Sequence, residues 1–322
     1  MSKKNVLFIN GIGDNGLVTV RSITKNGQHI LGYTGGTNLF EHIKSSLFEK
    51  AMLILDSNQS QDISLQKYDL IFNQISDADT HKITLSKVKN IYNVFPRETV
   101  LLNHPNAILN TTRESIYKNL QNINNLIVPK TIRISPKSVV DIYNALKKEN
   151  LIFPIIFRQA GDHGGISTIL IEDDSQRFDQ FALDGRDYYL TQYVDYKHQN
   201  TYTKYRLIII DGEVFIRHCI FSDNWIIHSQ SRENKYLTLE QTTLENFDTK
   251  IKPKIAHIIT NIYKTIQLDY FGIDCNIDKE NNILLFELNA NMNVLLKSNN
   301  YTDKYTLKIN QAITDMIHRN LL

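Results

Sequence analysis

The sequence predicts a small parallel α/β lobe followed by a larger α+β region. Over residues 1–104, short apolar runs alternate with helix-compatible segments, an order typical of a parallel sheet with helical connections. From Pro154 onward, strand-like runs follow one another in hairpin order, which indicates largely antiparallel pairing. A chain of 322 residues that is 42% hydrophobic can bury separate cores, so we expect two or three compact lobes.

Four apolar runs define the first lobe, which we place at residues 1–104. The first run is followed by a glycine-rich turn at residues 11–16, and helix-compatible segments are expected between the runs. Runs of this length bounded by polar residues and glycine indicate buried strands. The expected strands are Val6–Asn10, Met52–Leu55, Leu70–Asn73 and Val100–Asn103.

The second lobe, residues 105–194, is predicted to begin with helices. We expect one helix at Thr111–Leu126, ended by Val128 and Pro129, and another that runs to Lys148. Ser135 is expected to cap this second helix, with Pro136 in its first position. The strands expected after the helices are Ile155–Arg158, Ser167–Ile171 and Tyr188–Val194.

The third lobe, residues 195–322, is predicted as hairpins covered by helices. An Asp211-Gly212 turn separates two strands, and isoleucines at helical spacing predict a core-facing helix over residues 255–266. A last helix is expected at Thr306–His318. The expected strands are Tyr205–Ile210, Glu213–Phe221, Gly272–Ile277 and Ile283–Leu288.

Composition excludes several classes of function. The formal charge is +2 and the basic residues are scattered, so the chain lacks the field of a dedicated nucleic-acid binder. No apolar run approaches a membrane span, and the one near the start is too short for a signal peptide. Cys219 and Cys275 lie in apolar runs without a CxxC spacing, which predicts buried thiols rather than a disulfide or zinc site. We expect a soluble, cytoplasmic protein.

The most specific chemical pattern is Asp274 followed by Glu287 and Asn289. Two adjacent strands would bring Asp274 beside Glu287, and residues two apart on one strand share a face. Mg²⁺ takes few protein carboxylates and completes its coordination with water and phosphate oxygens, so this sparse set suits a metal–nucleotide complex. The alternative is two solvated acids on an ordinary hairpin, which the apolar neighbours of both acids disfavour.

A second pattern joins Arg158 to the glycine-rich segment 159–167. Small residues let the backbone approach phosphate oxygens while a cation binds them. Taken alone, such a segment is more often an ordinary hairpin loop, and the ending typical of a Walker loop is absent. The phosphate-binding candidates in the segment are Gly161, His163, Gly164, Gly165 and Ser167.

A third pattern is the polar end of the strand at Tyr188–Val194. Free backbone groups at Gln192, Tyr193 and Val194 could bond an adenine edge, with Asp195 near the ribose hydroxyls. A plain edge strand is the alternative interpretation.

Taken in order, these residues resemble the ATP-grasp superfamily, which includes D-alanine:D-alanine ligase, glutathione synthetase and the ribosomal-protein glutamate ligases. The resemblance covers residues 100–322, and the first hundred resemble the α/β lobe that usually precedes the ATP-grasp lobes. It implies two α+β lobes that clamp ATP, with two Mg²⁺ ions held by Asp274, Glu287 and Asn289. Residues 161–167 would form the loop over the phosphates, and 192–194 the adenine hinge.

At several positions this sequence differs from the residues that are usual in the ATP-grasp superfamily. Arg113 and Arg158 stand where the family usually has two phosphate-binding lysines, and an arginine offers a bidentate fork instead of a point charge. Gly272 stands where peptide ligases often place an arginine. Arg206 would face the transferred phosphoryl group, and we take Arg206 and His218 as catalytic candidates. Others that could replace the missing arginine are Arg217, His228 and Arg232.

The function implied is an ATP-dependent carboxylate–amine or carboxylate–thiol ligase that works through an acyl phosphate. Its partners would be a small-molecule or peptide carboxylate and an amine or thiol acceptor, with neither nucleic acid nor membrane. Two alternatives stay open, a kinase-type phosphotransferase and a non-catalytic nucleotide-binding protein. The oligomeric state is open too.

Overall fold

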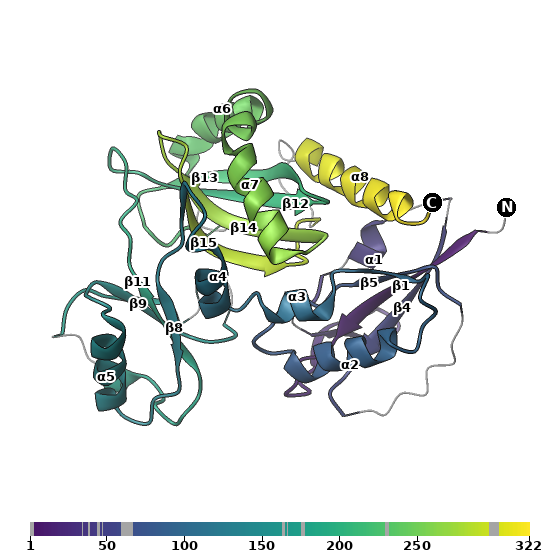
Figure 1. Ribbon diagram of the computed structural model, residues 1–322, viewed down its shortest axis with the longest axis horizontal. Coiled ribbons are helices and arrows are strands. Elements are labelled where there is room, and N and C mark those ends of the chain that lie inside the picture. The colour runs from purple at the N-terminus through teal and green to yellow at the C-terminus, as the bar shows by residue number, and fades with distance from the viewer. Residues whose placement is uncertain are drawn as a thin grey trace.

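The computed structural model describes most of the chain. The described residues are 3–33, 35–37, 39–43, 46, 48–58, 67–162, 165, 167–174, 178–228, 232–295 and 303–322. Three groups of elements are visible in Figure 1, each built on its own sheet. Among the described residues no helix combines the length and apolar character needed to cross a membrane.

The first sheet is parallel, in the order β4-β1-β5-β6. The four predicted strands are confirmed, and helix α2 (Lys82–Tyr92) lies between the last two. The strand bounds are β1 (Lys4–Gly11), β4 (Phe48–Leu55), β5 (Leu70–Asn73) and β6 (Val100–Leu102).

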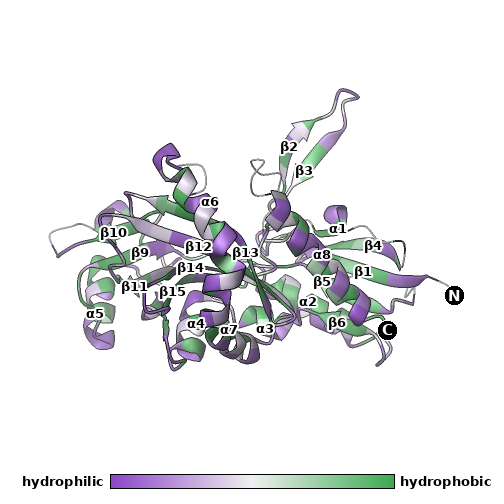
Figure 2. Ribbon diagram, turned by 90° about the horizontal axis from the view of Figure 1, so that it is seen from above, coloured by the Kyte–Doolittle hydropathy of each residue, from purple (hydrophilic) through white to green (hydrophobic). Residues whose placement is uncertain are grey.

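The segment between the first two predicted strands differs from the expectation. It forms a β-hairpin, β2 (Thr19–Ile23) with β3 (His29–Gly32), and then only the single helical turn α1 (Leu39–His42). Asn26 and Gly27 lie in the turn between the two strands, with Gly27 at φ 77°, a conformation that glycine adopts freely. The hairpin projects away from the body of the molecule (Figure 2).

The second sheet is antiparallel, in the order β10-β9-β11-β8. Helix α5 (Val139–Glu149) packs on it through Ile142 and Leu146, in a core that includes the short 3₁₀ helix Phe178–Gln180. The strand bounds are β8 (Thr131–Ile134), β9 (Ile155–Gln159), β10 (Ile169–Ile171) and β11 (Tyr188–Gln192).

Two helix predictions in this region are wrong in their bounds. Ser138, not Ser135, caps α5, because Asp141 three residues later completes a capping box. The helix expected at Thr111–Leu126 is shorter: α3 (Pro105–Leu109) and α4 (Arg113–Leu120) flank a turn. The chain then leaves the helix so that β7 (Leu126–Ile127) can pair with the third sheet.

The third sheet has the order β13-β12-β14-β15-β7 and is antiparallel except for its last pair. Cys219 and Cys275 are free and buried in it, as predicted. Its further strands are β12 (Tyr202–Ile210), β13 (Glu213–Ser222), β14 (Tyr270–Ile277) and β15 (Ile283–Ala290). The helical segments beside it are η3 (Asn234–Tyr236), α6 (Leu237–Asn246), the π-helical turn Phe247–Ile251, α7 (Lys252–Ile266) and α8 (Asp303–Arg319).

Two hydrophobic cores join the first and third sheets. The predicted isoleucine face of α7 is buried in one of them, and Ile309 and Ile313 of α8 pack in the other with Phe8 and Ile208. Asn103, fully buried at φ 56°, ties the two sheets together: its Nδ2 donates to the Tyr270 carbonyl, and its Oδ1 accepts from the Tyr270 amide. The second sheet has a separate core. The architecture is the mixed α/β and α+β arrangement that the sequence predicts.

Candidate functional site

A cavity of about 290 Å³ lies between the second and third sheets. Its lining combines apolar residues such as Ile156, Leu285 and Phe286 with charged residues. Ten of the predicted site residues line this cavity. They are Arg113, Arg158, Gly165, Gln192, Tyr193, Val194, Arg206, His218, Asp274 and Glu287.

A smaller polar pocket of about 40 Å³ adjoins the cavity at its charged end. Arg113, Arg158 and Glu287 line both spaces, and Gly161 and Asn289 line the pocket. The loop after β5, at residues 76–79, supplies another part of its wall. The two spaces therefore meet at a cluster of two guanidinium groups and one carboxylate.

Four predicted residues form a continuous row across the third sheet. In strand register, His218 lies opposite Arg206, Arg206 opposite Asp274, and Asp274 opposite Glu287. A bulge next to the Asp274–Glu287 pair adds Phe286 to β15 and so places Glu287 in the cavity wall. Residues opposite one another in a sheet share a face, so all four side chains serve the same surface.

Asp274 and Arg206 form a bidentate ion pair. Arg206 donates from Nε and Nη2 to the two carboxylate oxygens of Asp274, at 2.7 Å each. Burial alone would raise the pKa of Asp274, but the Arg206 charge outweighs it and holds that pKa well below its usual range. Asp274 is therefore ionised at neutral pH.

Glu287 is also ionised in its place at the junction. Arg113 donates to Glu287 Oε2 at 2.7 Å and to the Phe286 carbonyl at 2.9 Å. Asn289 donates to Glu287 Oε1 at 2.9 Å, so both polar side chains lie together as predicted. Burial raises the pKa of Glu287, yet the Arg113 charge more than offsets it and the net pKa is lowered.

The donor chemistry of this set fits Mg²⁺. Asp274, Glu287 and Asn289 offer two ionised carboxylates and one amide, a small hard-oxygen set of the kind Mg²⁺ binds together with phosphate and water. In the part of the chain that the structure describes, no group of three or more His, Cys, Asp or Glu side chains could hold a metal. A complete protein-only metal cage is therefore not formed by the described residues.

Arg158 is a buried cation beside another cation. It is 9% exposed, and among the described residues no hydrogen-bond acceptor meets its Nε. Burial, and then the charge of Arg113, lower the pKa of Arg158 to about 10, so it remains protonated at neutral pH. Burying a charge without full compensation costs free energy. An anionic ligand at the junction would supply the compensating negative charge.

The glycine-rich segment is only partly at the site. Gly161 and Gly165 have φ values of 82° and 79°, and each lines one of the two spaces. Ser167 lines neither space; its hydroxyl donates to Asp162 and accepts from the Gln159 amide. His163 and Gly164 lie outside the described residues.

The end of β11 supplies part of the apolar end of the cavity. Gln192 uses its side chain to hold residues 152–154, with Nε2 donating to the Ile152 carbonyl at 2.8 Å. Tyr193 and Val194 lie in the cavity wall. Asp195 is not in the wall, and its carboxylate instead accepts from the Lys197 amide at 3.1 Å.

His218 is held neutral. Burial, and then the charge of Arg206, lower its pKa well below the usual value. Its Nε2 meets no hydrogen-bond partner within the described part of the chain, and the ring lines the cavity. A neutral imidazole in this position can form a hydrogen bond with a ligand, and its lowered pKa disfavours protonation.

Two other candidates for a substrate cation lie elsewhere. Arg217 donates from Nε to the Val294 carbonyl, and Arg232 pairs with Glu240 at 2.8 Å. Neither lines the cavity, whereas His228 does.

Sequence reasoning missed Lys204 and Tyr196. Lys204 Nζ lies 3.5 Å from Asp274 and donates to the Ile227 carbonyl. It sits two residues before Arg206, so strand alternation could have predicted it. Tyr196, whose ring packs 4.8 Å from that of Phe286, had no comparable signal.

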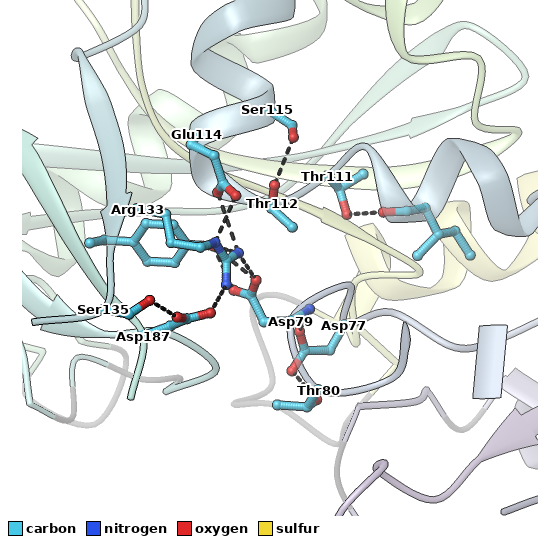
Figure 3. A network of polar contacts seen from close by, with 12 residues as sticks. Asp77, Asp79, Thr80, Thr111, Thr112, Glu114, Ser115, Arg133, Ser135 and Asp187 are labelled. Atoms are coloured by element: carbon cyan, nitrogen blue, oxygen red, sulfur yellow. Dashed lines mark hydrogen bonds and ion pairs between the residues drawn. The ribbon is translucent and has the colours of Figure 1, made fainter. Parts of the chain in front are cut away.

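A cluster around Arg133 was also missed. Arg133 on β8 donates to Glu114 at 2.7 Å and to Asp187 at 2.9 Å, and it pairs with Asp79. Tyr189 donates to the same Asp79 at 2.9 Å. Figure 3 shows the arginine between acids from α4, from the position just before β11 and from the loop after β5. These partners are far apart in sequence, so no local sequence pattern predicts their contacts.

Comparison with known proteins places this site in a family. A family model described as the RimK-like ATP-grasp domain matches residues 113–317, more than half of the chain. Among curated proteins, the coenzyme γ-F420-2:α-L-glutamate ligase of Methanococcus maripaludis is 24% identical over 200 residues, which are 60% of this chain and 69% of that protein.

Solved structures share the fold over nearly the whole chain. D-alanine–D-alanine ligase from Bacillus anthracis, complexed with ATP, has a TM-score of 0.57 at 11% identity, over 100% of this chain and 96% of that one. A RiPP-associated ATP-grasp ligase from Chryseobacterium gregarium, in complex with ADP and a leader and core peptide, has a TM-score of 0.51 at 13% identity, over 98% and 97%. The family match, joined to this fold, shows that the chain belongs to the RimK-like ATP-grasp family and confirms the prediction of an ATP-grasp ligase.

Proposed function

We propose that the chain binds ATP with Mg²⁺ in the cavity, activates a carboxylate as an acyl phosphate and joins it to an amine. The observation that carries this proposal is the junction itself, where two guanidinium groups and ionised carboxylates meet between the larger cavity, which is partly apolar, and the smaller polar pocket. Polyphosphate needs cations, an adenine ring needs apolar walls, and a second substrate needs a neighbouring space. The site offers all three.

The proposed orientation follows from this layout. The adenine ring would lie at the apolar end, near Tyr193 and Val194, and the γ-phosphate at the junction, near Arg113 and Arg158. The substrate carboxylate would then approach from the polar pocket. This order places the reacting atoms where the two spaces meet.

The residues would act by positioning and by charge. A carboxylate oxygen attacks the γ-phosphorus as ADP leaves, and the amine then attacks the acyl carbon as phosphate leaves. Arg206 and Arg158 would stabilise the charge on the transferred group, while neutral His218 would face the reacting substrates. Asp274, Glu287 and Asn289 would hold Mg²⁺, which when bound neutralises phosphate charge. No side chain has to form a covalent bond.

An amine acceptor is favoured over a thiol or a stable phosphate acceptor. The curated relative is named as a glutamate ligase, and the structural neighbour as a D-alanine–D-alanine ligase, both names that denote joining of amino acids. A kinase-type enzyme would yield a phosphorylated product instead of free phosphate. A non-catalytic nucleotide binder would yield neither.

Turnover by the purified protein tests the proposal. With ATP, Mg²⁺ and a panel of amino acids and acidic peptides, we expect ADP and phosphate in equal amounts and a new amide in the mass spectrum. Glu287→Gln should abolish ADP formation, while the matched control Glu213→Gln, exposed and paired with Lys252, should retain it. A phosphorylated end product would establish the kinase alternative, and wild-type turnover by Glu287→Gln would refute the assignment of the site.

A further inference from the structure

The hairpin β2–β3 has an apolar face without cover. In strand register Val20 lies opposite Leu31 and Ile23 opposite His29, so these four side chains share one face of the ribbon. Val20, Ile23 and Leu31 are 55%, 61% and 58% exposed. Among the described residues no third strand pairs with the ribbon, and Figure 2 shows it standing clear of the body. We call these three side chains the ribbon face.

The opposite face of the ribbon is mixed. Thr19 and Ser22 lie there, opposite Gly32 and the exposed Ile30. A Cβ built on Gly32 would lie 3.5 Å from the Arg21 side chain, so that arginine lies beside Gly32 on this face. β2 carries a bulge at Arg21, whereas β3 is regular, which leaves β3 as the edge that can accept a further strand.

The charged side chains in and around the ribbon are all basic. Residues 15–40 contain Arg21 and Lys25 but no Asp or Glu. A strand added beside β3 would point alternate side chains at the ribbon face and at Arg21. The complementary partner therefore alternates apolar with acidic residues.

The base of the ribbon is bonded to the wall of the polar pocket. Ser76 donates from its amide and from its hydroxyl to the Gly35 carbonyl, at 2.6 and 2.9 Å, and Gly36 pairs with Ile75. Ser76 itself lines the pocket that also contains Glu287 and Asn289. A peptide bound along β3 would therefore pass from the base of the ribbon to the polar pocket.

We propose that β3 accepts an extended acidic peptide as an added strand and that this peptide carries the group on which the site acts. Main-chain hydrogen bonds to β3 would give affinity, and the alternation of apolar and acidic side chains would give specificity. The second half of the proposal rests on the ligase function proposed above, whereas the docking itself does not. Attachment of the ribbon at the pocket wall favours a substrate over a second copy of this chain as the occupant.

Binding of two synthetic peptides tests the docking. The probes are fluorescein-labelled ten-residue peptides of alternating Glu and Val, or of alternating Lys and Val, titrated by anisotropy without nucleotide. We expect the acidic peptide to bind at least about tenfold more tightly than the basic one. Hydrogen exchange should slow at residues 29–32 when the acidic peptide is bound.

Matched variants assign that binding to the ribbon. The double change Val20→Ser and Leu31→Ser should weaken the acidic peptide at least about tenfold, and Arg21→Ala should remove the preference for acid. Val94→Ser, which truncates another exposed valine at 61% exposure, should change nothing. All variants alter exposed side chains, and circular dichroism and binding of an ATP analogue verify their folding.

Three results overturn the docking proposal. They are equal binding of both peptides, an affinity unchanged by the Val20 and Leu31 double change, and self-association of the protein that this double change abolishes. The last would show that a second copy covers the ribbon face. Peptide binding without any ADP formation in the turnover assay would leave the docking intact and refute only the ligase function.

Discussion

At the scale of single residues, the site is defined by charges that the protein does not fully compensate. Arg158 is buried beside Arg113, and the acceptor for its Nε is absent among the described residues. Its Nη2 donates to the Asp162 carbonyl, so the guanidinium is partly compensated, and a bound anion would complete the compensation. This arrangement supports our proposal that the junction binds phosphate.

Removal of Arg158 should therefore weaken nucleotide binding more than it weakens folding. We expect Arg158→Ala to raise the Kd for an ATP analogue about 10- to 100-fold, the loss of one charge-assisted contact, while thermal stability stays equal or rises. Isothermal titration calorimetry and thermal denaturation measure the two effects. Arg319→Ala, which removes an exposed arginine paired with Asp211, is the control. An unchanged Kd would exclude Arg158 from the phosphate site.

The Arg206–Asp274 pair should make stability depend on pH. The folded-state pKa of Asp274 lies below its unfolded value, so the stabilisation is present above the unfolded pKa and is lost as the pH falls through the folded one. Asp274→Asn should cost about 3 kcal/mol at neutral pH, because it leaves Arg206 without its partner. This difference from the wild type should shrink below about pH 4.

Urea unfolding of both proteins across acidic and neutral pH measures this effect. The double change Arg206→Met with Asp274→Leu should cost less than the single change, because no buried charge is then left alone. A difference between wild type and Asp274→Asn that stays constant with pH would contradict the pairing.

At the scale of elements, the spacing of apolar residues along the sequence predicted those strands and helices whose burial follows a regular local pattern. The parallel strands, the hairpin at Asp211-Gly212 and the isoleucine face of α7 were all found, since each is a local pattern of apolar residues. Pairing of β14 with β15 brought Asp274 and Glu287 together as expected. Part of the site was therefore readable from the strand pattern.

The errors also have identifiable causes. The Asn26-Gly27 pair is a typical hairpin turn. The prediction of a helix-compatible segment there did not take this signal into account. Ser138 with Asp141 was the better capping signal than Ser135. Asn125 adopts φ 63°, a left-handed conformation in which the chain changes direction after α4. The residues before it are compatible with a helix, so the sequence did not predict this change. The Arg133 cluster depends on contacts between distant segments, which no local pattern encodes.

That cluster should stabilise the junction of three elements. Arg133→Met leaves the carboxylates of Asp79, Glu114 and Asp187 facing one another without their shared cation. We expect a loss of about 2–4 kcal/mol in the free energy of unfolding, measured in urea, because these acids are partly buried. Arg186→Met, whose arginine is exposed and paired with Asp184, should change it by less than about 0.5 kcal/mol. Similar losses in both variants would argue against a special role for the cluster.

At the scale of the whole molecule, two sheets form one body and a third has its own core. The first and third sheets share two hydrophobic cores and the Asn103 hydrogen bonds, whereas the second sheet packs separately with α5. The cavity lies where the separate sheet faces the joined body. A ligand there contacts both, so its binding free energy adds directly to their association.

The central claim is that metal and nucleotide bind together at Asp274, Glu287 and Asn289. Calorimetry with a non-hydrolysable ATP analogue, with Mg²⁺ and then with a chelator, tests it most directly. We predict that Mg²⁺ tightens binding by the wild type and by Glu213→Gln at least about tenfold, and that Glu287→Gln loses this enhancement. An affinity that is indifferent to Mg²⁺ in the wild type, or equally enhanced in Glu287→Gln, would contradict the account.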